Sequence, residues 1–359
     1  MNITIAGGGN IGTQFAVHCA EKNHRVIMYN SKPDRFDKHL SIVDENGVTI
    51  HEGDITEATN DAEKAFSDAD IIFVTVPAFC MKDMSEQILP YVKKGAKIGL
   101  IPGTGGGEWF FRKYMEKGAV LFGLQRVPSV ARLVEYGKSV CASGYRPELH
   151  VAALPHRYTR ELQEIIASIF DKPCVDLPNY LNLILAPSNP ILHTTRLRIL
   201  FKDYCEGRVY ESVPLFYEEW NDESSELLFK CDDELQRVCR TLKEFDLSYV
   251  KSLRIHYESE TPEQLTRKIT SIQSFKGLKT PTIECDGGYI PDLHSRYFTA
   301  DFTFGLGILV QIAEFAGVEV PYMKETLEWY EQIAIVKDSF CFADFGISNS
   351  EEFLALYRQ

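Results

Sequence analysis

The sequence predicts two domains, an α/β domain at the N-terminus followed by an all-helical domain. Short apolar runs that end in proline or glycine recur along the first half, and the first of them leads directly into a glycine-rich turn. From about residue 180 these runs give way to long segments with apolar residues at helical spacing. A chain of 359 residues also has the length of two compact domains. The boundary is expected near Pro178, which gives domains of residues 1–178 and 179–359.

The composition is that of a folded, soluble protein, with 45% hydrophobic and 25% charged residues. The net charge of -13 argues against nucleic acid and anionic membrane surfaces as partners, because both favour clustered Lys and Arg. A small anionic substrate stays open, since a few local arginines can bind it whatever the total charge.

The nine cysteines are scattered, with no CxxC pair and no second cluster at the spacing of zinc ligands. This pattern predicts free thiols in a reducing compartment and no metal site. Met1 runs directly into an apolar strand, which leaves no room for a signal peptide, and no apolar run reaches the ~20 residues that a membrane span requires. We therefore expect a cytoplasmic protein that does not associate with membranes.

The first strand is expected at residues 2–6 (NITIA), and it leads into a turn with the spacing G-x-G-x-x-G. Gly7 would make the tight turn, Gly9 would let the backbone approach a pyrophosphate, and Gly12 would let the following helix pack on the strand. The pyrophosphate would lie at the helix N-terminus, where free N–H groups and the helix dipole favour an anion. A second strand at residues 24–30 (HRVIMYN) completes the pattern of a Rossmann unit.

Two further strands are expected at residues 69–77 (ADIIFVTVP) and 93–103 (KKGAKIGLIPG), with a helix between them. Loops at the carboxyl ends of such strands face the cofactor. Pro77 and Thr104, the latter within the run PGTGGG, are therefore candidates for contacts with nicotinamide, ribose or substrate. A plain turn is an equally good interpretation of either one.

The end of the second strand bears on the choice of cofactor. An NAD site usually carries Asp or Glu there to bind the ribose hydroxyls, but this chain has Tyr-Asn-Ser-Lys at residues 29–32 and Arg35 just beyond. These side chains can bind a 2′-phosphate that a carboxylate would repel, so we expect NADP(H), although Asp34 leaves NAD(H) open. The expected cofactor site comprises Gly7, Gly9, Asn10, Ile11, Gly12, Asn30, Ser31, Lys32, Arg35 and Pro77.

The second half is expected to be helical. Apolar residues at helical spacing predict long helices at residues 223–245 and 303–318, whereas the acidic stretch YEEWNDESSE at residues 217–226 is expected to be a solvated face. An earlier helix is expected in the segment NLILAPSNPILHTTRLRIL, with Asn189 as its cap and His193 about one turn inside. A lone histidine on a helix is more often structural than catalytic, so both interpretations stay open at this point.

The stretch SRYFTADFTFGLG, residues 295–307, begins another expected helix. Thr299 is a suitable cap, and Asp301 would then lie in the first turn, where negative charge meets the positive end of the helix dipole. Gly305 could serve only close packing. Capping and packing alone would account for all three residues.

Three motifs follow one another along the chain: G-x-G-x-x-G at the N-terminus, N-P-I-x-H at the start of the helical half, and R-Y-x-x-x-D-x-x-x-G-L further on. This arrangement resembles the opine dehydrogenases of the octopine/nopaline dehydrogenase family, and the resemblance spans both domains. Segments 102–106 (PGTGG) and 128–132 (P-x-x-A-R) also resemble family segments. The later two motifs are carried by Asn189, Pro190, Ile191, Leu192 and His193, and by Arg296, Tyr297, Asp301, Gly305 and Leu306.

The resemblance implies a 6-phosphogluconate dehydrogenase-like helical domain and a dehydrogenase that acts on CH–NH donors. The implied reaction joins the amine of an amino acid to the ketone of a 2-oxo acid such as pyruvate, and NAD(P)H reduces the resulting imine. It also implies that His193 is the general acid and base, that Asp301 orients its ring, and that Arg296 holds the oxo-acid carboxylate. These residue types suit the chemistry, because histidine titrates near neutral pH, a carboxylate fixes its tautomer, and a guanidinium binds a carboxylate through two parallel hydrogen bonds.

Further substrate contacts are expected from Asn189, Thr104 and Arg126. The match to the family is looser around residues 125–129, so Arg126 could bind the carboxylate of the amino acid or have a structural role. Ala300 stands where the family often has an acidic residue, which puts one supporting contact in doubt. Gly305, four residues after Asp301, would leave space for another group to approach.

Two other functions stay open from the sequence. A ketopantoate-type or other 2-oxoacid reductase would share the two domains, but it would be expected to carry a lysine as proton donor where this chain offers His193. A non-catalytic NADP(H)-sensing protein would not need His193 to meet Asp301. A homodimer also stays open, because the apolar C-terminal helices could form either a core or an interface.

Overall fold

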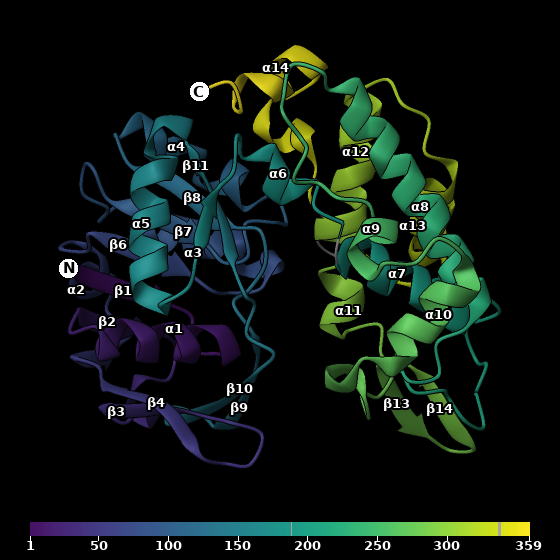
Figure 1. Ribbon diagram of the computed structural model, residues 1–359, viewed down its shortest axis with the longest axis horizontal. Coiled ribbons are helices and arrows are strands. Elements are labelled where there is room, and N and C mark those ends of the chain that lie inside the picture. Colours follow the sequence, from purple (N-terminus) through teal and green to yellow (C-terminus); the bar gives the residue numbers. More distant parts are fainter. Residues whose placement is uncertain (188, 337–338) are drawn as a thin grey trace. The chain divides into compact units, whose positions relative to one another are not determined.

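The computed structural model describes residues 1–187, 189–336 and 339–359, and the chain forms two compact units (Figure 1). Unit 1 comprises Met1–Ile184 and Ala355–Gln359, and unit 2 comprises Leu185–Leu354. Unit 1 thus extends past the expected boundary at residue 178, and it also includes the end of the chain.

Buried aromatic contacts explain both differences from the expected boundary. The hydroxyl of Tyr180 lies so close to Gly123 that a Cβ there would be 3.0 Å from it, so the segment after residue 178 packs within unit 1. At the end of the chain, the Tyr357 hydroxyl donates to Glu108 Oε1 (2.8 Å) and accepts from Trp109 Nε1 (2.9 Å). Burial raises the pKa of Glu108 to about 7, because a desolvated carboxylate is costly.

The main sheet of unit 1 is largely parallel. Its eight strands are β1 (Asn2–Ala6), β2 (Arg25–Tyr29), β5 (Glu57–Thr59), β6 (Ile71–Val74), β7 (Lys97–Leu100), β8 (Val120–Leu124), β11 (Leu149–Leu154) and β12 (Cys174–Asp176). They follow the order β12-β11-β8-β7-β6-β1-β2-β5, and only β11 and β12 run against the others. The four strands expected from the apolar runs are β1, β2, β6 and β7, which confirms the Rossmann domain.

Helices cover both faces of this sheet (Figure 1). Helices α1 and α5 contact each other, whereas α2, α3 and α4 form a second contacting group. Apolar residues fill the space between helices and sheet, for example where the ring of Phe15 meets those of Phe73 (5.0 Å) and Phe170 (4.9 Å). The helices of unit 1 are α1 (Asn10–Glu21), α2 (Ala62–Phe66), α3 (Met81–Ile88), α4 (Gly107–Glu116), α5 (Thr159–Phe170) and α6 (Leu181–Ile184).

A second, four-stranded sheet packs against α1 and was not expected from the sequence. Its strands are β3 (His39–Val43), β4 (Thr49–Asp54), β9 (Val130–Glu135) and β10 (Ser139–Ser143), in the order β4-β3-β10-β9. The Leu133 N–H donates to Asn10 Oδ1 (2.9 Å), and Gly53 lies against Ala20, so both edges of this sheet hold α1. These strands are too polar and too exposed for the apolar-run criterion to find them.

The three glycines of the first turn lie where their expected tasks require. Gly7 has φ of +121°, which favours glycine. A Cβ on Gly12 would lie 1.7 Å from the carbonyl oxygen of Gly7, so only glycine lets α1 approach β1 this closely. Gly9 has no atom within 4 Å of the position of a Cβ, and its backbone faces open space.

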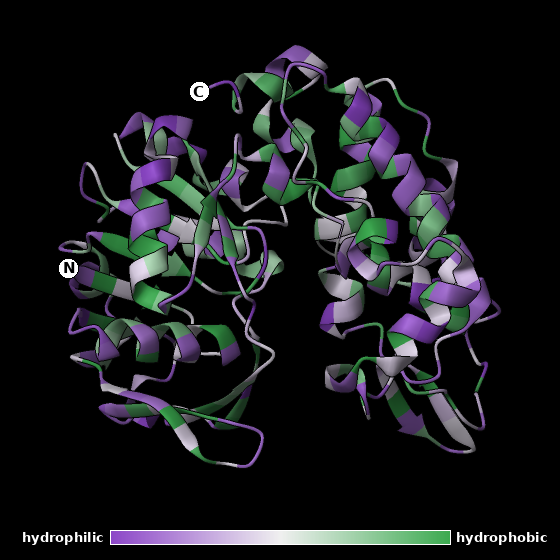
Figure 2. Ribbon diagram, viewed as in Figure 1, coloured by the Kyte–Doolittle hydropathy of each residue, from purple (hydrophilic) through white to green (hydrophobic). Residues whose placement is uncertain are grey.

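Unit 2 is mainly helical, as expected. Its helices are α7 (Asn189–Leu200), α8 (Asp222–Thr241), α9 (Leu253–Tyr257), α10 (Pro262–Ser271), α11 (Arg296–Thr299), α12 (Gly307–Phe315), α13 (Pro321–Ile333) and α14 (Ser350–Ala355). Side-chain caps define several starts, such as Asn221, which accepts from the N–H of Ser224 at the start of α8 (3.0 Å). Hydrophobic residues alternate with hydrophilic ones along α8 and α10 (Figure 2). One hairpin, formed by β13 (Thr282–Cys285) and β14 (Gly288–Pro291), adds strands that the sequence did not indicate.

The helix expected to begin at Thr299 begins instead at Arg296. Thr299 lies inside it and donates its hydroxyl proton to the carbonyl oxygen of Ser295 (3.1 Å), so it is not a cap. Between α11 and α12 the chain makes one π turn, Phe302–Leu306, in which the Leu306 N–H donates to the Asp301 carbonyl (2.8 Å). Asp301 therefore lies at a π bulge in the middle of a long helical stretch, not in a first turn.

This stretch, Arg296–Phe315, is long and apolar enough by composition to cross a membrane, contrary to the expectation that no such run exists. However, 67% of its apolar window is buried inside the protein. Burial of this kind is typical of the core helix of a folded unit.

We expect Gly12→Ala to lower the free energy of unfolding by about 3 kcal/mol or more, because its Cβ would overlap a backbone carbonyl that cannot move aside. Gly9→Ala is the matched control: Gly9 has φ of -88° and open space around it, so its change should stay within about 1 kcal/mol. Urea unfolding of both variants measures the difference. Equal stability of the two would contradict the assigned packing.

Candidate active site

His193 is the centre of a buried polar cluster in unit 2. It lies in α7 and is 7% exposed. Its Nδ1 lies 2.8 Å from Asp301 Oδ2, which joins residues 108 positions apart in the chain. Because an ionised carboxylate only accepts hydrogen bonds, this pairing favours, for the neutral imidazole, the tautomer with its proton on Nδ1 and its lone pair on Nε2.

The second ring nitrogen of His193 is also hydrogen-bonded. The hydroxyl of Tyr217 lies 2.6 Å from Nε2, and with the proton on Nδ1 it is Tyr217 that donates. The rings of Tyr297 and Phe216 lie 4.5 Å and 5.5 Å from the imidazole. The imidazole is thus held by two hydrogen bonds and two aromatic neighbours.

The close approach of α7 to the π turn brings His193 to Asp301. A Cβ on Gly305 would lie 2.9 Å from both Cβ and Cγ of Pro190, so the absence of a side chain at Gly305 permits this approach. The space predicted beside Gly305 is therefore filled by Pro190. The π bulge and the N-P-I-x-H motif meet at this contact.

Arg196 lies three residues after His193 on the same side of α7 and is 1% exposed. Burial lowers its pKa to about 10, so the guanidinium stays charged at neutral pH. It fixes the loop that carries Tyr217, because its donors bind on both sides of that residue. The acceptors are the carbonyl oxygens of Leu215 (3.3 Å), Phe216 (2.9 Å) and Glu219 (2.7 Å), the hydroxyl of Ser224 (3.1 Å) and the side-chain oxygen of Asn221 (3.5 Å).

The two expected substrate contacts of unit 2 are exposed. Arg296 is the first residue of α11, and its guanidinium makes no hydrogen bond or ion pair with any residue that the structure describes. Asn189 was expected to cap α7, but it is itself the first residue of that helix, so the helix begins one residue earlier than expected. Both side chains are accessible to a small molecule, as a substrate contact requires.

Unit 1 gathers the other expected site residues at one edge of its main sheet. The parallel strands β1, β2, β6, β7 and β8 all end at this edge. The residues that follow these strands are Gly7, Gly9, Asn10, Ile11 and Gly12 after β1, Asn30, Ser31, Lys32 and Arg35 after β2, Pro77 after β6, Thr104 after β7, and Arg126 after β8.

The side chains after β2 are mostly exposed. Ser31, Lys32 and Arg35 all face solvent, and the Arg35 guanidinium lies over the ring of Tyr136 at 4.9 Å. Asn30 is buried, and its side-chain nitrogen has no hydrogen-bond partner among the described residues. Asp34 is exposed as well, within a short 3₁₀ turn.

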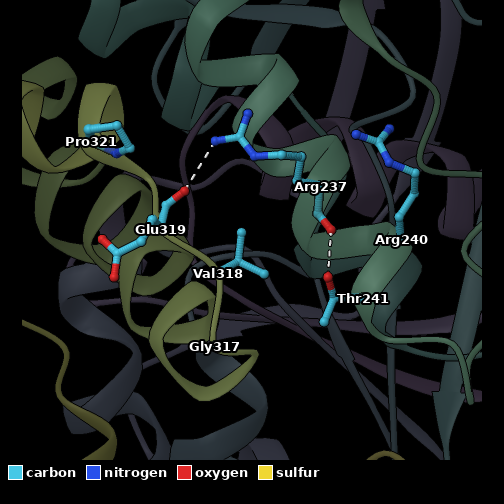
Figure 3. Close-up of a pocket in the computed structure, with 7 residues that line it drawn as sticks. All are labelled: Arg237, Arg240, Thr241, Gly317, Val318, Glu319 and Pro321. Carbon is cyan, nitrogen blue, oxygen red and sulfur yellow. Dashed lines mark hydrogen bonds between the residues drawn. The ribbon is translucent and has the colours of Figure 1, made fainter.

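The two hollows described in the structure lie elsewhere. One in unit 2, of about 640 Å³, is lined by Arg237, Arg240, Thr241, Gly317, Val318, Glu319 and Pro321 (Figure 3). There Arg237 donates to the Glu319 carbonyl (3.1 Å), which Figure 3 shows as a dashed line. One in unit 1, of about 570 Å³, lies beside the end of α4 and Gln359. Neither is lined by His193, Asp301 or Arg296.

A group of possible metal ligands lies in unit 1, where ligand atoms of His18, Glu21 and His51 are within 4.8 Å of one another. Each histidine already has a partner: His18 Nε2 lies 3.0 Å from the Tyr145 hydroxyl, and His51 Nδ1 lies 3.0 Å from Glu21. Burial lowers the pKa of His18 to about 3. The absence of a metal site remains a prediction.

The sequence did not indicate Tyr217 or Arg196. Residues 217–226 were expected to be a solvated face, but Tyr217 and Trp220 are each 4% exposed and Ser224 and Ser225 are fully buried. The aromatic residues at a spacing of three within this acidic stretch were the one local signal of burial. Arg196 could have been noticed because it shares a helix face with His193.

Comparison with known proteins finds a dehydrogenase family model that matches each of the two units. Residues 2–103 match the family model described as NAD-dependent glycerol-3-phosphate dehydrogenase N-terminus. Residues 176–334 match the family model described as NAD/NADP octopine/nopaline dehydrogenase, alpha-helical domain. The helical part of the chain is thus similar to the α-helical domain of the octopine/nopaline dehydrogenases, which confirms the resemblance that the motifs predicted.

Opine dehydrogenase relatives match along most of the chain. The opine dehydrogenase of Haliotis discus hannai is 28% identical over 366 residues, which cover 92% of this chain and 90% of the relative. The octopine dehydrogenase of Mizuhopecten yessoensis is 25% identical, with the same coverage. A solved structure of octopine dehydrogenase with NADH and agmatine has a TM-score of 0.84 at 20% identity, covering 99% of this chain and 98% of that chain. It confirms the expected fold.

We expect Gly305→Ala to lower the free energy of unfolding by about 1–3 kcal/mol, because the added Cβ must push Pro190 and the start of α7 away from the π turn. Gly307→Ala, two residues later, is the control: its Cβ would meet no atom closer than 3.3 Å, so its stability should change by less than about 1 kcal/mol. Chemical denaturation compares the two. A Gly305→Ala variant as stable as wild type would contradict the role of this contact.

Proposed function

We propose that the chain catalyses the NAD(P)H-dependent, reversible condensation of an amino acid with a 2-oxo acid such as pyruvate, which forms a secondary amine dicarboxylate. The hydrogen bond between His193 and Asp301 carries this proposal, because it supplies a buried, oriented acid and base in a chain that also contains a dinucleotide-binding fold. The match to the α-helical domain of the octopine/nopaline dehydrogenases supports the reaction type, and one solved octopine dehydrogenase structure contains NADH and pyruvate.

The N-terminus of α1 suits a nicotinamide dinucleotide. Gly9 leaves open space beside the first N–H groups of the helix, and these groups with the helix dipole favour a pyrophosphate. When bound, the reduced nicotinamide supplies the hydride. Pro77 and Thr104, after β6 and β7, would contact its nicotinamide end or the substrate.

NADP(H) is the preferred cofactor in this proposal. Lys32 and Arg35 are exposed beyond the end of β2, as is the hydroxyl-bearing Ser31. Donors and cations favour a 2′-phosphate, whereas a carboxylate at the same place would repel it. Asp34 is the one acidic side chain of this turn, and it is exposed.

His193 moves the protons of the condensation. The amine adds to the ketone carbon to form a carbinolamine, and the protonated imidazole then gives its Nε2 proton to the departing hydroxyl, which leaves as water. The remaining iminium accepts the hydride and becomes the secondary amine. Asp301 stabilises the imidazolium before this transfer and holds the ring in the correct tautomer.

Arg296 orients the 2-oxo acid. Its exposed guanidinium has no partner among the described residues and can bind the carboxylate through two parallel hydrogen bonds. Asn189, at the start of α7, would contribute a further polar contact, and Arg126 in unit 1 would bind the carboxylate of the amino acid.

We expect NADPH oxidation to require both a 2-oxo acid and an amine, since hydride is transferred to the iminium and not to the ketone. The measurement is the loss of nicotinamide absorbance with pyruvate and other 2-oxo acids, each alone and with the twenty amino acids or agmatine. Running the panel with NADPH and NADH compares the cofactors, and NADPH should give the higher kcat/KM.

Three results would contradict parts of this proposal. Oxidation at full rate with the oxo acid alone would indicate a simple 2-oxoacid reductase. Cofactor binding without turnover across the whole panel would indicate a sensing protein. A higher kcat/KM with NADH would overturn the cofactor preference and leave the reaction unchanged.

A further inference from the structure

The proton-transfer atom of His193 is covered by another side chain. Asp301 binds Nδ1, so Nε2 is the one ring nitrogen that can exchange a proton with a substrate. The Tyr217 hydroxyl lies 2.6 Å from this atom and is within unit 2, as is His193. Any proton that moves to or from Nε2 must therefore pass through this hydroxyl or wait for it to leave.

The ring of Tyr217 is packed against aromatic neighbours. It stacks on Phe275 with 4.1 Å between the ring centres and 19° between the planes, and it lies parallel to Trp220 at 6.2 Å. The side chain is 4% exposed. Rotation of the ring away from His193 would break this stacking and has little free space to enter.

The backbone that carries Tyr217 is fixed as well. Arg196 binds the carbonyl oxygens of Leu215, Phe216 and Glu219, which flank Tyr217. From the other side, the Phe216 N–H donates to the carbonyl of Leu278 (2.9 Å). Movement of this loop would leave the buried guanidinium of Arg196 without its acceptors, which is costly.

We propose that Tyr217 is a further catalytic residue, which relays the proton between His193 Nε2 and the reacting oxygen of the substrate; this inference rests on the proposed condensation. The phenol gives its hydroxyl proton to the departing hydroxyl of the carbinolamine, while the Nε2 proton of the imidazolium passes to the phenol oxygen. Water leaves, the imidazole becomes neutral, and the phenol is unchanged. No phenolate forms, because both transfers occur together.

The test compares Tyr217→Phe, which keeps the stacked ring and removes the hydroxyl, with Tyr330→Phe as control. Tyr330 is an equally buried tyrosine of unit 2 (3% exposed) that stacks on Phe302 and has no contact with His193. We expect kcat to fall about 100-fold in Tyr217→Phe, within the range for loss of a general acid, with NADPH affinity within about twofold of wild type. Tyr330→Phe should keep the wild-type kcat.

A proton inventory adds a measurement that a structural role would not affect. In mixtures of H₂O and D₂O, a relay transfers two protons in one step, so the wild-type rate should depend on the deuterium fraction along a curve. In Tyr217→Phe the dependence should become linear. The wild-type measurement alone tests the relay, even if the variant folds poorly. A linear dependence of the wild-type rate on the deuterium fraction, under conditions where proton transfer limits the rate, would overturn the relay.

The outcomes separate this inference from the proposed function. A wild-type chain that turns over no pair of substrates overturns the condensation, and the relay with it. Turnover by wild type and Tyr217→Phe at the same rate overturns the relay alone. Independently of turnover, the ¹⁵N signal of His193 Nε2, assigned with His193→Gln, should shift in Tyr217→Phe; an unchanged signal would contradict the hydrogen bond itself.

Discussion

The candidate active site depends on the hydrogen bond between His193 and Asp301. The packing around these two residues brings their side chains within hydrogen-bonding distance. A hydrogen bond to a charged group contributes only about 1.5–3 kcal/mol, too little to bring two distant helices together by itself. Instead Gly305 lets Pro190 approach the π turn, and this contact places the imidazole 2.8 Å from the carboxylate. The π bulge, the N-P-I-x-H motif and the glycine of the later motif therefore act together to position His193 and Asp301.

The two units divide the physical tasks of the proposed reaction. Unit 1 offers an anion-binding helix terminus at Gly9 and a row of loops at one edge of a parallel sheet. Unit 2 offers a buried acid and base, with the cation Arg196 holding the neighbouring loop and the exposed Arg296 open to an anionic substrate. The proposed binding of anionic small molecules is compatible with a net charge of -13, since the cations and N–H groups that it requires act locally.

Features set by local backbone requirements could be predicted from the sequence, and features set by distant contacts could not. The strands β1, β2, β6 and β7, the turn at Gly7 and the close packing at Gly12 follow from short-range pattern and geometry. The cap at Thr299 was wrong, because the helix starts at Arg296 and a π turn intervenes. The burial of Tyr217 was not predicted, because its acidic neighbours suggested a solvated segment. Its ring is buried by Phe275, and Arg196 fixes its loop by hydrogen bonds to backbone carbonyl oxygens.

The kinetics of Asp301→Asn, measured beside its affinity for NADPH, test the central claim most directly. Asparagine keeps the size of aspartate, but it has no charge to stabilise the imidazolium, and its amide can donate to Nδ1 and so reverse the tautomer. If the His193–Asp301 pair is the acid and base, kcat of this variant falls by about 100-fold or more, while the Kd for NADPH stays within about twofold of wild type. A kcat within about threefold of wild type would contradict it, because proton transfer would then not depend on this pair.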